Sequence, residues 1–294
     1  MRDLDKNITI IIVTFKSQKV IEKCLISIDN RYPVIVIENS NDENFKKLLE
    51  NKFRNVKCIL AGKNIGMGPA NNIGIKNATT DFVLISNPDV CFYKDTIKNL
   101  FNSAKQIENF TILAPIIAKI NNKFPNYGMF DKSKIKIDER FNYLKVDYVD
   151  GFAMLINKKK FSSQNFFDEN FFMYLENVDI CKRIKNRGEN VYIIPNSKVD
   201  HLGASAVDPI YSLEVELSRN WHWMWSSFYY NKKHNGFFIA VLKILSKFFS
   251  SLIKLIFYIV TFNKIKKLIQ KQRLSGIVNA IFGKKSWYRP KIPN

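Results

Sequence analysis

Three apolar runs open the chain, and a polar loop follows each of them. Residues 8–13 and 33–37 are rich in Ile and Val, and residues 56–60 form a shorter run. The first two runs are continuous rather than alternating, which is typical of strands covered on both faces. Amphipathic segments at 20–28 and 43–51 lie between the runs. This order predicts parallel strands joined by right-handed helical crossovers.

A fourth apolar run, at 82–85, ends in Asn87-Pro88-Asp89. Pro88 cannot donate a hydrogen bond to a sheet ladder, so the strand should end there. Asp89 would then lie at the carboxyl end of a buried strand, where open α/β sheets bind ligands. A carboxylate in that place can hold a divalent cation, which suits phosphate oxygens. An ordinary Asn-Pro-Asp turn is the competing interpretation, because one short motif has little specificity.

The chain between the third and fourth runs is rich in glycine. Gly68-Pro69 is typical of a loop that enters a helix, with Pro69 in the first turn, where free amides can bind a phosphate or a sugar hydroxyl. The Gly-x-Gly-x-x-Gly spacing of dinucleotide sites is absent, and a plain glycine turn explains the loop equally well. Thr14, Glu38 and Asp89 nevertheless follow three strands of one predicted parallel sheet. Together they suit a pocket of nucleotide size.

Further motifs continue this order over about residues 8–205. They are Val13-Thr14-Phe15, Ile37-Glu38-Asn39-Ser40, Asn64-Ile-Gly66 with Asn71-Asn72-x-Gly74, Ser86-Asn-Pro-Asp89, Asp150-Gly151-Phe-Ala-Met154, Phe171-Phe-Met-Tyr174-Leu-Glu176-Asn-Val-Asp179 and His201. The series resembles the family 2 glycosyltransferases of the GT-A fold, nearest to the bacterial rhamnosyltransferase-like branch. The resemblance implies an α/β fold with a Rossmann-like, mostly parallel central sheet flanked by helices. It also implies a glycosyltransferase domain at 1–205, with a nucleotide-sugar half at about 1–92 and an acceptor half at 93–205.

The resemblance implies that a nucleotide-sugar donor binds across the first half of the sheet. Thymidine-diphosphate rhamnose and uridine-diphosphate sugars are the donors that it suggests. Thr14 and Phe15 would contact the base or ribose, and Glu38 would anchor one of them. The other donor-binding positions that it implies are Asn64, Gly66, Asn71, Asn87 and Gly151. For Gly151, a bulge glycine without ligand contact is the alternative.

The implied cofactor is a divalent cation, Mg2+ or Mn2+. Asp89 takes the place of the final acid in the family's Asp-x-Asp metal motif, whereas Asn87 replaces the first acid and leaves one carboxylate. His201 matches a position that completes the metal site in some relatives. Packing near the end of a strand at 191–194 explains His201 equally well.

The acceptor half should contain a strand pair, or a strand and a turn, at 110–120, a mobile polar loop at 121–140 and a return to the sheet at 148–156. Glu176 and Asp179 follow, three residues apart on one face of a predicted helix. In the family that the chain resembles, the acid after this glutamate usually serves as general base. That place is Asn177 here, and an amide cannot accept a proton.

The base would therefore be Glu176, with Asp179 as the alternative, although Asp179 also has helix salt-bridge spacing to Arg183. The implied chemistry is inverting transfer to a hydroxyl of a cell-surface polysaccharide or lipid-linked glycan, with no covalent intermediate.

Positive charge is concentrated in a C-terminal extension, predicted at 206–294. The formal net charge is +20, and residues 231–294 hold fourteen Lys or Arg and no Asp or Glu. An aromatic segment at 219–230 suits a membrane interface or a helix packed on the catalytic domain. The next predicted helix, 236–262, carries Lys243, Lys247 and Lys254 on one narrow side. That pattern and the basic stretch at 264–273 predict association of residues 231–294 with an anionic membrane surface.

The uncharged run at 255–263 is shorter than the roughly 20 residues of a bilayer span, although snorkelling lysines leave a re-entrant or tilted spanning helix open. The four cysteines have no metal or redox spacing, and no signal peptide opens the chain. We therefore expect a cytoplasmic protein, peripheral on the inner face of the cell membrane.

Two other functions compete with glycosyl transfer. A nucleic-acid binder would use the basic tail, but its charges alternate with Ile, Leu and Phe and leave no extended polar face, so no nucleic-acid partner is expected. A nucleotidyltransferase would share a nucleotide-binding sheet. It usually needs a lysine- and glycine-rich phosphate loop near the first strand, where this chain has Thr14-Phe15-Lys16.

Overall fold

The computed structural model describes residues 7–107, 109–118, 125–131, 135–161, 166–203 and 207–292. The chain divides into two compact units. The first comprises Met1–Ile65, Pro69–Asp168 and Asn177–Asp208, and the second comprises Gly66–Gly68, Glu169–Glu176 and Pro209–Asn294. The boundary predicted at 205/206 lies outside the described residues.

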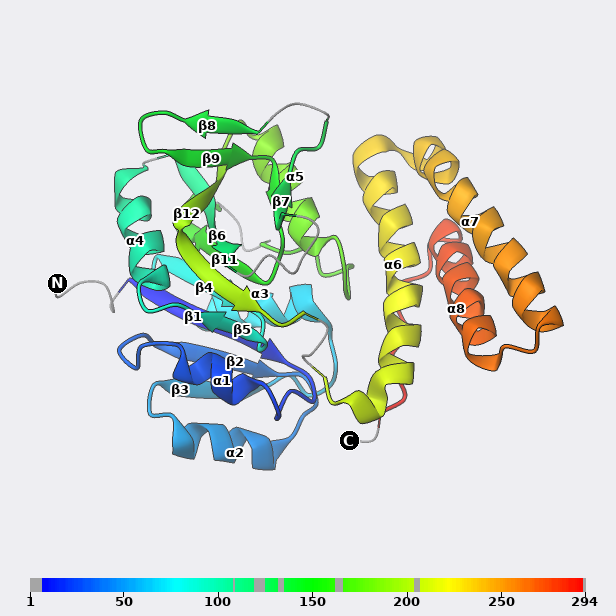
Figure 1. Cartoon of the computed structure of the whole chain (residues 1–294), viewed down its shortest axis with the longest axis horizontal. Coiled ribbons are helices and arrows are strands. Elements are labelled where there is room, and N and C mark those ends of the chain that lie inside the picture. The colour runs from blue at the N-terminus through cyan, green and yellow to red at the C-terminus, as the bar shows by residue number, and fades with distance from the viewer. Residues whose placement is uncertain are drawn as a thin grey trace. The chain divides into compact units, whose positions relative to one another are not determined.

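The first unit contains a mixed sheet, which has ten strands within the described part of the chain. Figure 1 shows its strands, whose order is β3 (Val56–Leu60), β2 (Val34–Glu38), β1 (Ile8–Thr14), β4 (Phe82–Ser86), β11 (Ala153–Asn157), β6 (Phe110–Ile117), β12 (Asn190–His201), β9 (Tyr143–Val146) and β8 (Lys136–Asp138), with β5 (Val90–Phe92) beside β12. The first four are parallel, as predicted, whereas β11 is antiparallel to both of its neighbours. The parallel half therefore presents its carboxyl ends along one edge.

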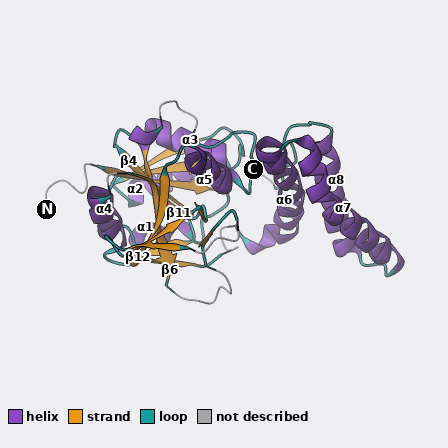
Figure 2. Ribbon diagram, turned by 90° about the horizontal axis from the view of Figure 1, so that it is seen from above, coloured by secondary structure: helices purple, strands orange, loops and turns teal. Residues whose placement is uncertain are grey.

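Helices lie on both faces of this sheet (Figure 2). Helices α1 (Ile21–Ile26), α2 (Glu43–Lys52) and α4 (Thr96–Gln106) share a core with Ile10 and Ile12 of β1. On the opposite face, Gly74 of α3 (Met67–Asn77) lies so close to Ile11 that an added Cβ would be 2.4 Å from its Cγ2. Continuous apolar strands are thus covered on both sides, as their pattern predicts.

Three sequence expectations for the acceptor half were too coarse. Residues 110–117 form the single strand β6 rather than a strand pair, and β12 runs on to His201 instead of ending at Ile194. The segment expected to be a loop contains β8 and the short strand β7 (Tyr127–Gly128), which pairs with β10 (Tyr148–Val149). Residues 119–124 and 132–134 lie outside the described residues. Strands of two or three residues depend on their partners and leave little periodicity to detect.

The second unit contains three helices that pack against one another, α6 (Ser212–Asn235), α7 (Phe237–Val260) and α8 (Lys264–Ile281), after the short helix η2 (Pro209–Tyr211). Their common core includes Trp221, Trp225 and Phe228 of α6. An added Cβ on Gly276 of α8 would lie 2.3 Å from the carbonyl oxygen of Trp221, so a glycine permits this close helix contact. The sequence left a membrane interface and packing on the catalytic domain equally open for the aromatic segment, which packs mainly inside this unit, with Trp223 38% exposed. No helix of the described residues is long and apolar enough to cross a membrane.

Candidate active site

The loops that follow β1 and β2 are tied together at the carboxyl edge of the sheet. The backbone N–H of Asn39 donates to the carbonyl of Thr14 at 2.9 Å, and the Lys16 N–H donates to Ser40 Oγ at 2.9 Å. Glu38 pairs with Thr14 in the strand register. The structure therefore brings these predicted positions to one edge.

The fully buried Glu38 shapes the loop after β2. Its Oε1 accepts from the Ser40 N–H at 2.9 Å, and its Oε2 accepts from the Asp42 N–H at 2.8 Å. Thr14 is also buried, and its hydroxyl donates to the carbonyl of Ile37 at 3.4 Å. Phe15 is half-buried, and its predicted contact with the base or ribose stays a prediction. Contacts of Thr14 and Glu38 with a donor stay predictions.

Two neighbouring asparagines on α3 differ in their hydrogen bonding. Asn72 is fixed to Phe167, because its Nδ2 donates to the Phe167 carbonyl at 2.8 Å and its Oδ1 accepts from the Phe167 N–H at 3.0 Å. Asn71 is buried, and its Oδ1 accepts no hydrogen bond from any described residue. Asn64, before this helix, is half-buried. Of the two helix residues, Asn71 thus has spare capacity for a ligand.

Three strand ends converge on Asp89. The Asn87 N–H donates to the carbonyl of Phe152 at 2.9 Å, and the Leu202 N–H donates to the carbonyl of Asp89 at 3.2 Å. His201, at the end of β12, directs Nε2 toward Asp89 Oδ1 at 3.3 Å. The His201 ring also stacks on Phe152, with ring centroids 4.4 Å apart. The two predicted metal ligands therefore lie side by side.

These two side chains fit a divalent cation. Asp89 is 3% exposed, and within the described residues its Oδ1 has no hydrogen-bond donor apart from the ion-pair contact with His201. Neighbouring ligands of an octahedral ion with bonds of about 2.1 Å lie about 3.0 Å apart, close to the observed separation. No group of three or more His, Cys, Asp or Glu forms a metal site in the described chain. A cation at the predicted site would thus have two protein ligands, and donor phosphates would complete the shell.

Asp150 was given no role by the sequence, although it belongs to one of the quoted motifs. Asp150 is exposed at the surface, but desolvation by the neighbouring protein raises the pKa of its carboxyl, and the His201 charge opposes that shift. Asp150 is therefore a third acid or base near the Asp89–His201 pair. Its place just before β11 was the available signal, because the antiparallel β11 begins at the edge where β4 ends.

Gly151 has a packing reason that involves α5 (Glu176–Asn186). An added Cβ on Gly151 would lie 3.2 Å from the Cβ of Asn177, which is tighter than ordinary contact. Asn177 Nδ2 donates to the carbonyl of Val149 at 2.8 Å. The start of α5 is thus fixed against the segment that precedes β11, and a donor contact of Gly151 stays a prediction.

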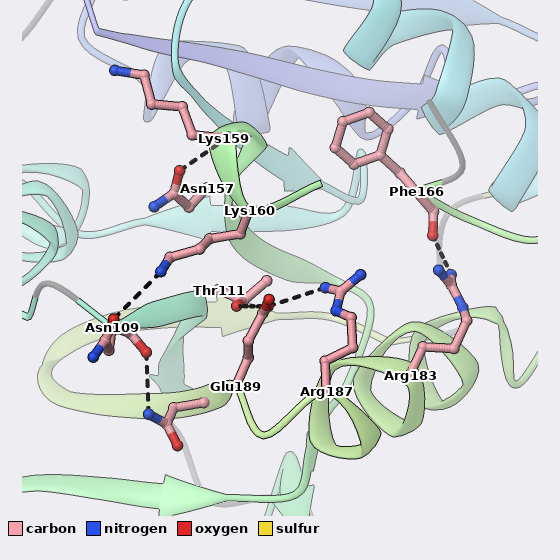
Figure 3. Close-up of polar contacts among 10 residues, drawn as sticks. Asn109, Thr111, Asn157, Lys159, Lys160, Phe166, Arg183, Arg187 and Glu189 are labelled. Carbon is pink, nitrogen blue, oxygen red and sulfur yellow. Dashed lines mark hydrogen bonds and ion pairs between the residues drawn. The ribbon is translucent and has the colours of Figure 1, made fainter. Parts of the chain in front are cut away.

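Asp179 is fully buried and paired with Arg183 on the next turn of α5, with Nε 2.9 Å from Oδ2. Arg183 also donates to the carbonyl of Phe166 (Figure 3). The helix salt bridge suggested by the spacing is therefore present.

The residues before Glu176 belong to the second unit and have unusual backbone conformations. Tyr174 and Leu175 have φ values of 69° and 67°. Side chains in this left-handed region cost about 1–2 kcal/mol per residue, so packing must hold the turn in place. Burial raises the pKa of the Tyr174 phenol, and Arg219 opposes the shift through its charge and, to a smaller extent, through a hydrogen bond. Gly66 of the same unit would place an added Cβ 2.3 Å from the Phe172 carbonyl oxygen, so close packing explains this glycine.

The chain is similar to several proteins of glycan synthesis. Low-salt glycan biosynthesis hexosyltransferase Agl10 of Haloferax volcanii is 27% identical over 215 residues, covering 69% of this chain and 68% of that protein. Rhamnosyltransferase WbbL of Escherichia coli is 25% identical over 220 residues, covering 63% and 80%. N-acetylglucosaminyl-diphospho-decaprenol L-rhamnosyltransferase of Mycobacterium tuberculosis is 22% identical over 233 residues, covering 65% and 75%.

The crystal structure of GalNAc-T7 with UDP, GalNAc and Mn2+ matches 79% of this chain with a TM-score of 0.55 at 12% identity. The match covers 52% of that protein, about half of its length, and shows a GT-A-like fold. The sequence profile of glycosyl transferase family 2 matches residues 9–163. Because this match covers more than half of the 294 residues of the chain, the chain belongs to glycosyl transferase family 2.

Proposed function

We propose that the protein is an inverting glycosyltransferase that moves a sugar from a nucleoside diphosphate to a hydroxyl of a polysaccharide or lipid-linked glycan. The observation that carries the proposal is the Asp89–His201 pair at the carboxyl edge of the parallel strands, in a chain of this family. The rhamnosyltransferase names of two relatives favour thymidine-diphosphate rhamnose as donor, with uridine-diphosphate sugars as the alternative. Membership of this family argues against a nucleotidyltransferase.

Donor binding is assigned to the edge formed by the loops after β1, β2 and β4. Phe15 offers an apolar surface to the base, and Asn71 offers an unpaired carbonyl oxygen. Asp89 and His201 would hold Mg2+ or Mn2+, which would offset the charge that develops on the departing diphosphate. The structural neighbour solved with Mn2+ supports a cation of this kind.

The proposed general base is Glu176. It is half-buried, follows the turn formed by Tyr174 and Leu175, and precedes Asn177, which is fixed at Val149. Asp179 is a weaker candidate, because it is buried and Arg183 occupies one of its oxygens. Glu176 would take the proton of the acceptor hydroxyl as that oxygen attacks the anomeric carbon from the side opposite the leaving diphosphate.

Membrane association is assigned to one face of α7. Exposed apolar side chains recur at three- and four-residue spacing along it, at Phe238, Leu242, Leu245, Phe249, Ile253, Ile256 and Val260. Lys243 and Lys254 are exposed on the same helix, and no Asp or Glu occurs from residue 231 onward. An apolar face beside lysines suits the interface of an anionic bilayer. Lys247 is half-buried and does not belong to the exposed lysines, which corrects the stripe of three that the sequence predicts.

A donor panel tests the proposed function. Purified protein is incubated with Mn2+ and each of thymidine-diphosphate rhamnose, uridine-diphosphate glucose and uridine-diphosphate N-acetylglucosamine, and released nucleoside diphosphate is measured. We expect one donor to be consumed faster when a glycan acceptor is added. Release of pyrophosphate from a nucleoside triphosphate and a sugar phosphate, without consumption of any nucleotide sugar, would instead identify a nucleotidyltransferase. Tight binding of duplex DNA with no donor consumption would favour the nucleic-acid alternative.

A further inference from the structure

Two cations that the transfer site does not use lie half-buried among the three helices of the second unit. Lys247 Nζ of α7 donates to Ser227 Oγ of α6 at 3.3 Å. Arg273 of α8 donates from Nε to Ser251 Oγ at 3.2 Å and from Nη1 to Asn220 Oδ1 at 3.0 Å. Because Ser251 follows Lys247 by one helical turn, Arg273 of α8 contacts the turn of α7 that follows Lys247.

Neither cation forms an ion pair with a carboxylate in the described part of the chain. Burial lowers the pKa of Lys247, and the Arg273 charge lowers it further. Burial also lowers the pKa of Arg273, which Glu216 partly opposes. Two like charges held together with neutral hydrogen-bond partners are an unfavourable arrangement that a bound anion would relieve.

Aromatic side chains connect the cation pair with the segment that carries Glu176. Lys247 Nζ lies 5.4 Å from the centroid of the partly exposed Trp223 ring. Tyr174 meets Trp223 edge-on, with centroids 5.5 Å apart, and stands two residues before Glu176. The second unit thus carries a cation pair, the rings of Trp223 and Tyr174 beside it, and the Glu176 carboxylate two residues after Tyr174. Trp and Tyr offer an apolar surface with a polar handle, which suits a sugar ring.

The exposed apolar face of α7 belongs to the same helix as Lys247. A helix with its side chains is about 10–12 Å across, so an anion at Lys247 lies about one helix diameter from that face. A molecule that carries phosphate on an apolar chain would match both features. Lys and Arg are the usual ligands of phosphate oxygens, and the guanidinium fork binds two of them at once.

We propose that Lys247 and Arg273 bind the phosphate or diphosphate of a lipid-linked acceptor, and that Trp223 and Tyr174 bind the sugar attached to it. The inference rests on the proposed function and names the acceptor class. It concerns binding, and no bond is made or broken at this site.

Vesicle binding by the full chain tests the site without donor or turnover. The probes are a polyprenyl diphosphate in phosphatidylcholine vesicles, phosphatidylglycerol vesicles of equal total charge, and inorganic pyrophosphate as soluble competitor. We expect the diphosphate lipid to bind at least about 10-fold more tightly than phosphatidylglycerol, and pyrophosphate to compete, since charge-assisted hydrogen bonds to phosphate oxygens are stronger than neutral ones. Equal binding of the two vesicle types would mean general attraction to anionic lipid and would overturn the proposal.

The paired variant Lys247→Gln with Arg273→Gln should lose this preference. The matched control is Lys284→Gln with Lys285→Gln, which removes two exposed positive charges from the same unit and should keep it. An equal loss in both pairs contradicts a specific site. Because the first pair alters packing, the pyrophosphate-induced rise in the melting temperature of the unchanged protein is measured as well. Absence of that rise, together with absence of lipid preference, rules the site out whatever the variant's stability.

Kinetics separate this inference from the proposed function. With a lipid diphosphate acceptor, Lys247→Gln should raise the acceptor KM about 10-fold or more and leave the KM of the donor unchanged. With a phosphate-free soluble acceptor, the variant should match the unchanged protein. If no donor is consumed under any condition, the proposed function fails while the binding result still stands on its own. If transfer occurs and the lipid-acceptor KM does not change, the site alone is wrong.

Discussion

Asp179 Oδ2 accepts a hydrogen bond from Arg183 Nε at 2.9 Å, one helical turn further along α5. Asp179 is fully buried, whereas the Arg183 side chain is 25% exposed. Arg183 reaches on to the carbonyl of Phe166, which Figure 3 shows beside α5. The pair therefore links the helix that begins at Glu176 to the segment at Phe166.

Asp179→Asn should destabilise the fold more than it slows transfer. The variant leaves Arg183 without its buried carboxylate, and loss of one partner of such a pair costs about 2–4 kcal/mol in the free energy of unfolding. Urea denaturation measures this loss, and the transfer rate is corrected for the folded fraction. Asp138→Asn is the control, because its partner Arg140 is 76% exposed and surface pairs contribute little. A large rate loss in stably folded Asp179→Asn would instead make Asp179 a candidate base.

Asp89→Asn should abolish or severely reduce transfer while the protein remains folded. Asn keeps the shape of Asp89 but removes the negative charge next to His201 that a divalent cation requires. The measurements are the transfer rate across a Mn2+ titration and the melting temperature with and without Mn2+. Asp95→Asn is the control, since Asp95 is exposed and its side chain caps no helix. Near-normal turnover of Asp89→Asn at limiting metal would disprove the assignment of Asp89 to the cation.

The sequence predicts the nucleotide-binding half of the sheet closely. Continuous runs of Ile and Val at 8–13 and 34–37 can only be buried between two helical layers, and Pro88 ends β4 as its chemistry requires. The parallel register then brings Thr14 and Glu38 to one edge. His201 was predicted from its place at the end of the series of family motifs. The hydrophobic periodicity is local and could not connect it with Asp89, which is more than one hundred residues away in the chain.

The remaining features depend on tertiary contacts that no local pattern specifies. The sequence could not show that Lys247 turns toward Ser227, since its helical angle differs little from those of the exposed Lys243 and Lys254. The Tyr174–Leu175 turn was equally hidden, because neither residue type favours a positive φ.

Acid should weaken the second unit through His222. The ring is buried, its Nε2 lies 2.8 Å from the Tyr288 carbonyl oxygen and its Nδ1 lies 3.0 Å from Ser286 Oγ. Burial lowers the pKa of His222 from 6.5 to about 3. The folded protein therefore keeps His222 neutral while the unfolded chain binds a proton. The contribution of His222 to the free energy of unfolding is fully present above about pH 6.5. It decreases toward pH 3, by up to about 1.4 kcal/mol per pH unit.

Urea denaturation at pH 7.5, 6 and 4.5 measures this dependence. His222→Gln should be less stable at pH 7.5 but should lose less stability on acidification. His234→Gln, at a half-buried position near the end of α6, is the control and should follow the unchanged protein. Parallel pH curves for His222→Gln and the unchanged protein would show that another group causes the acid response.

Charge reversal on α7 should detach the protein from anionic vesicles. Lys243 and Lys254 are exposed beside the apolar face, and each basic residue near an anionic surface contributes about 1 kcal/mol. Lys243→Glu with Lys254→Glu should therefore weaken binding to phosphatidylglycerol vesicles by more than 10-fold, as measured by cosedimentation at low salt. Lys76→Glu with Lys94→Glu is the control, because both lysines are exposed on the first unit. Binding that neither the reversal nor high salt alters would mean that apolar contact alone holds the protein on the membrane.

Glu176→Gln gives the sharpest test of the chemistry, since the sequence resemblance predicts Asn177 at the position where the family usually has the base. Gln keeps the shape and hydrogen bonding of Glu176 but cannot accept a proton. Loss of a general base typically lowers the rate by about 10²–10⁴-fold, so kcat should fall while the donor KM changes little. The measurement is the transfer rate at saturating donor, with folding checked by thermal melting.

Asn177→Asp examines the same assignment from the other side. The Asn177 amide donates to the Val149 carbonyl at 2.8 Å, and a carboxylate there would replace that hydrogen bond with repulsion between two acceptors. We therefore expect Asn177→Asp to be less stable and to leave most of the defect of Glu176→Gln in place when the two are combined. Full rescue in the double variant would mean that position 177 reaches the acceptor hydroxyl. In that case a carboxylate at either position 176 or position 177 could accept the proton, and Glu176 would no longer be the sole proposed base.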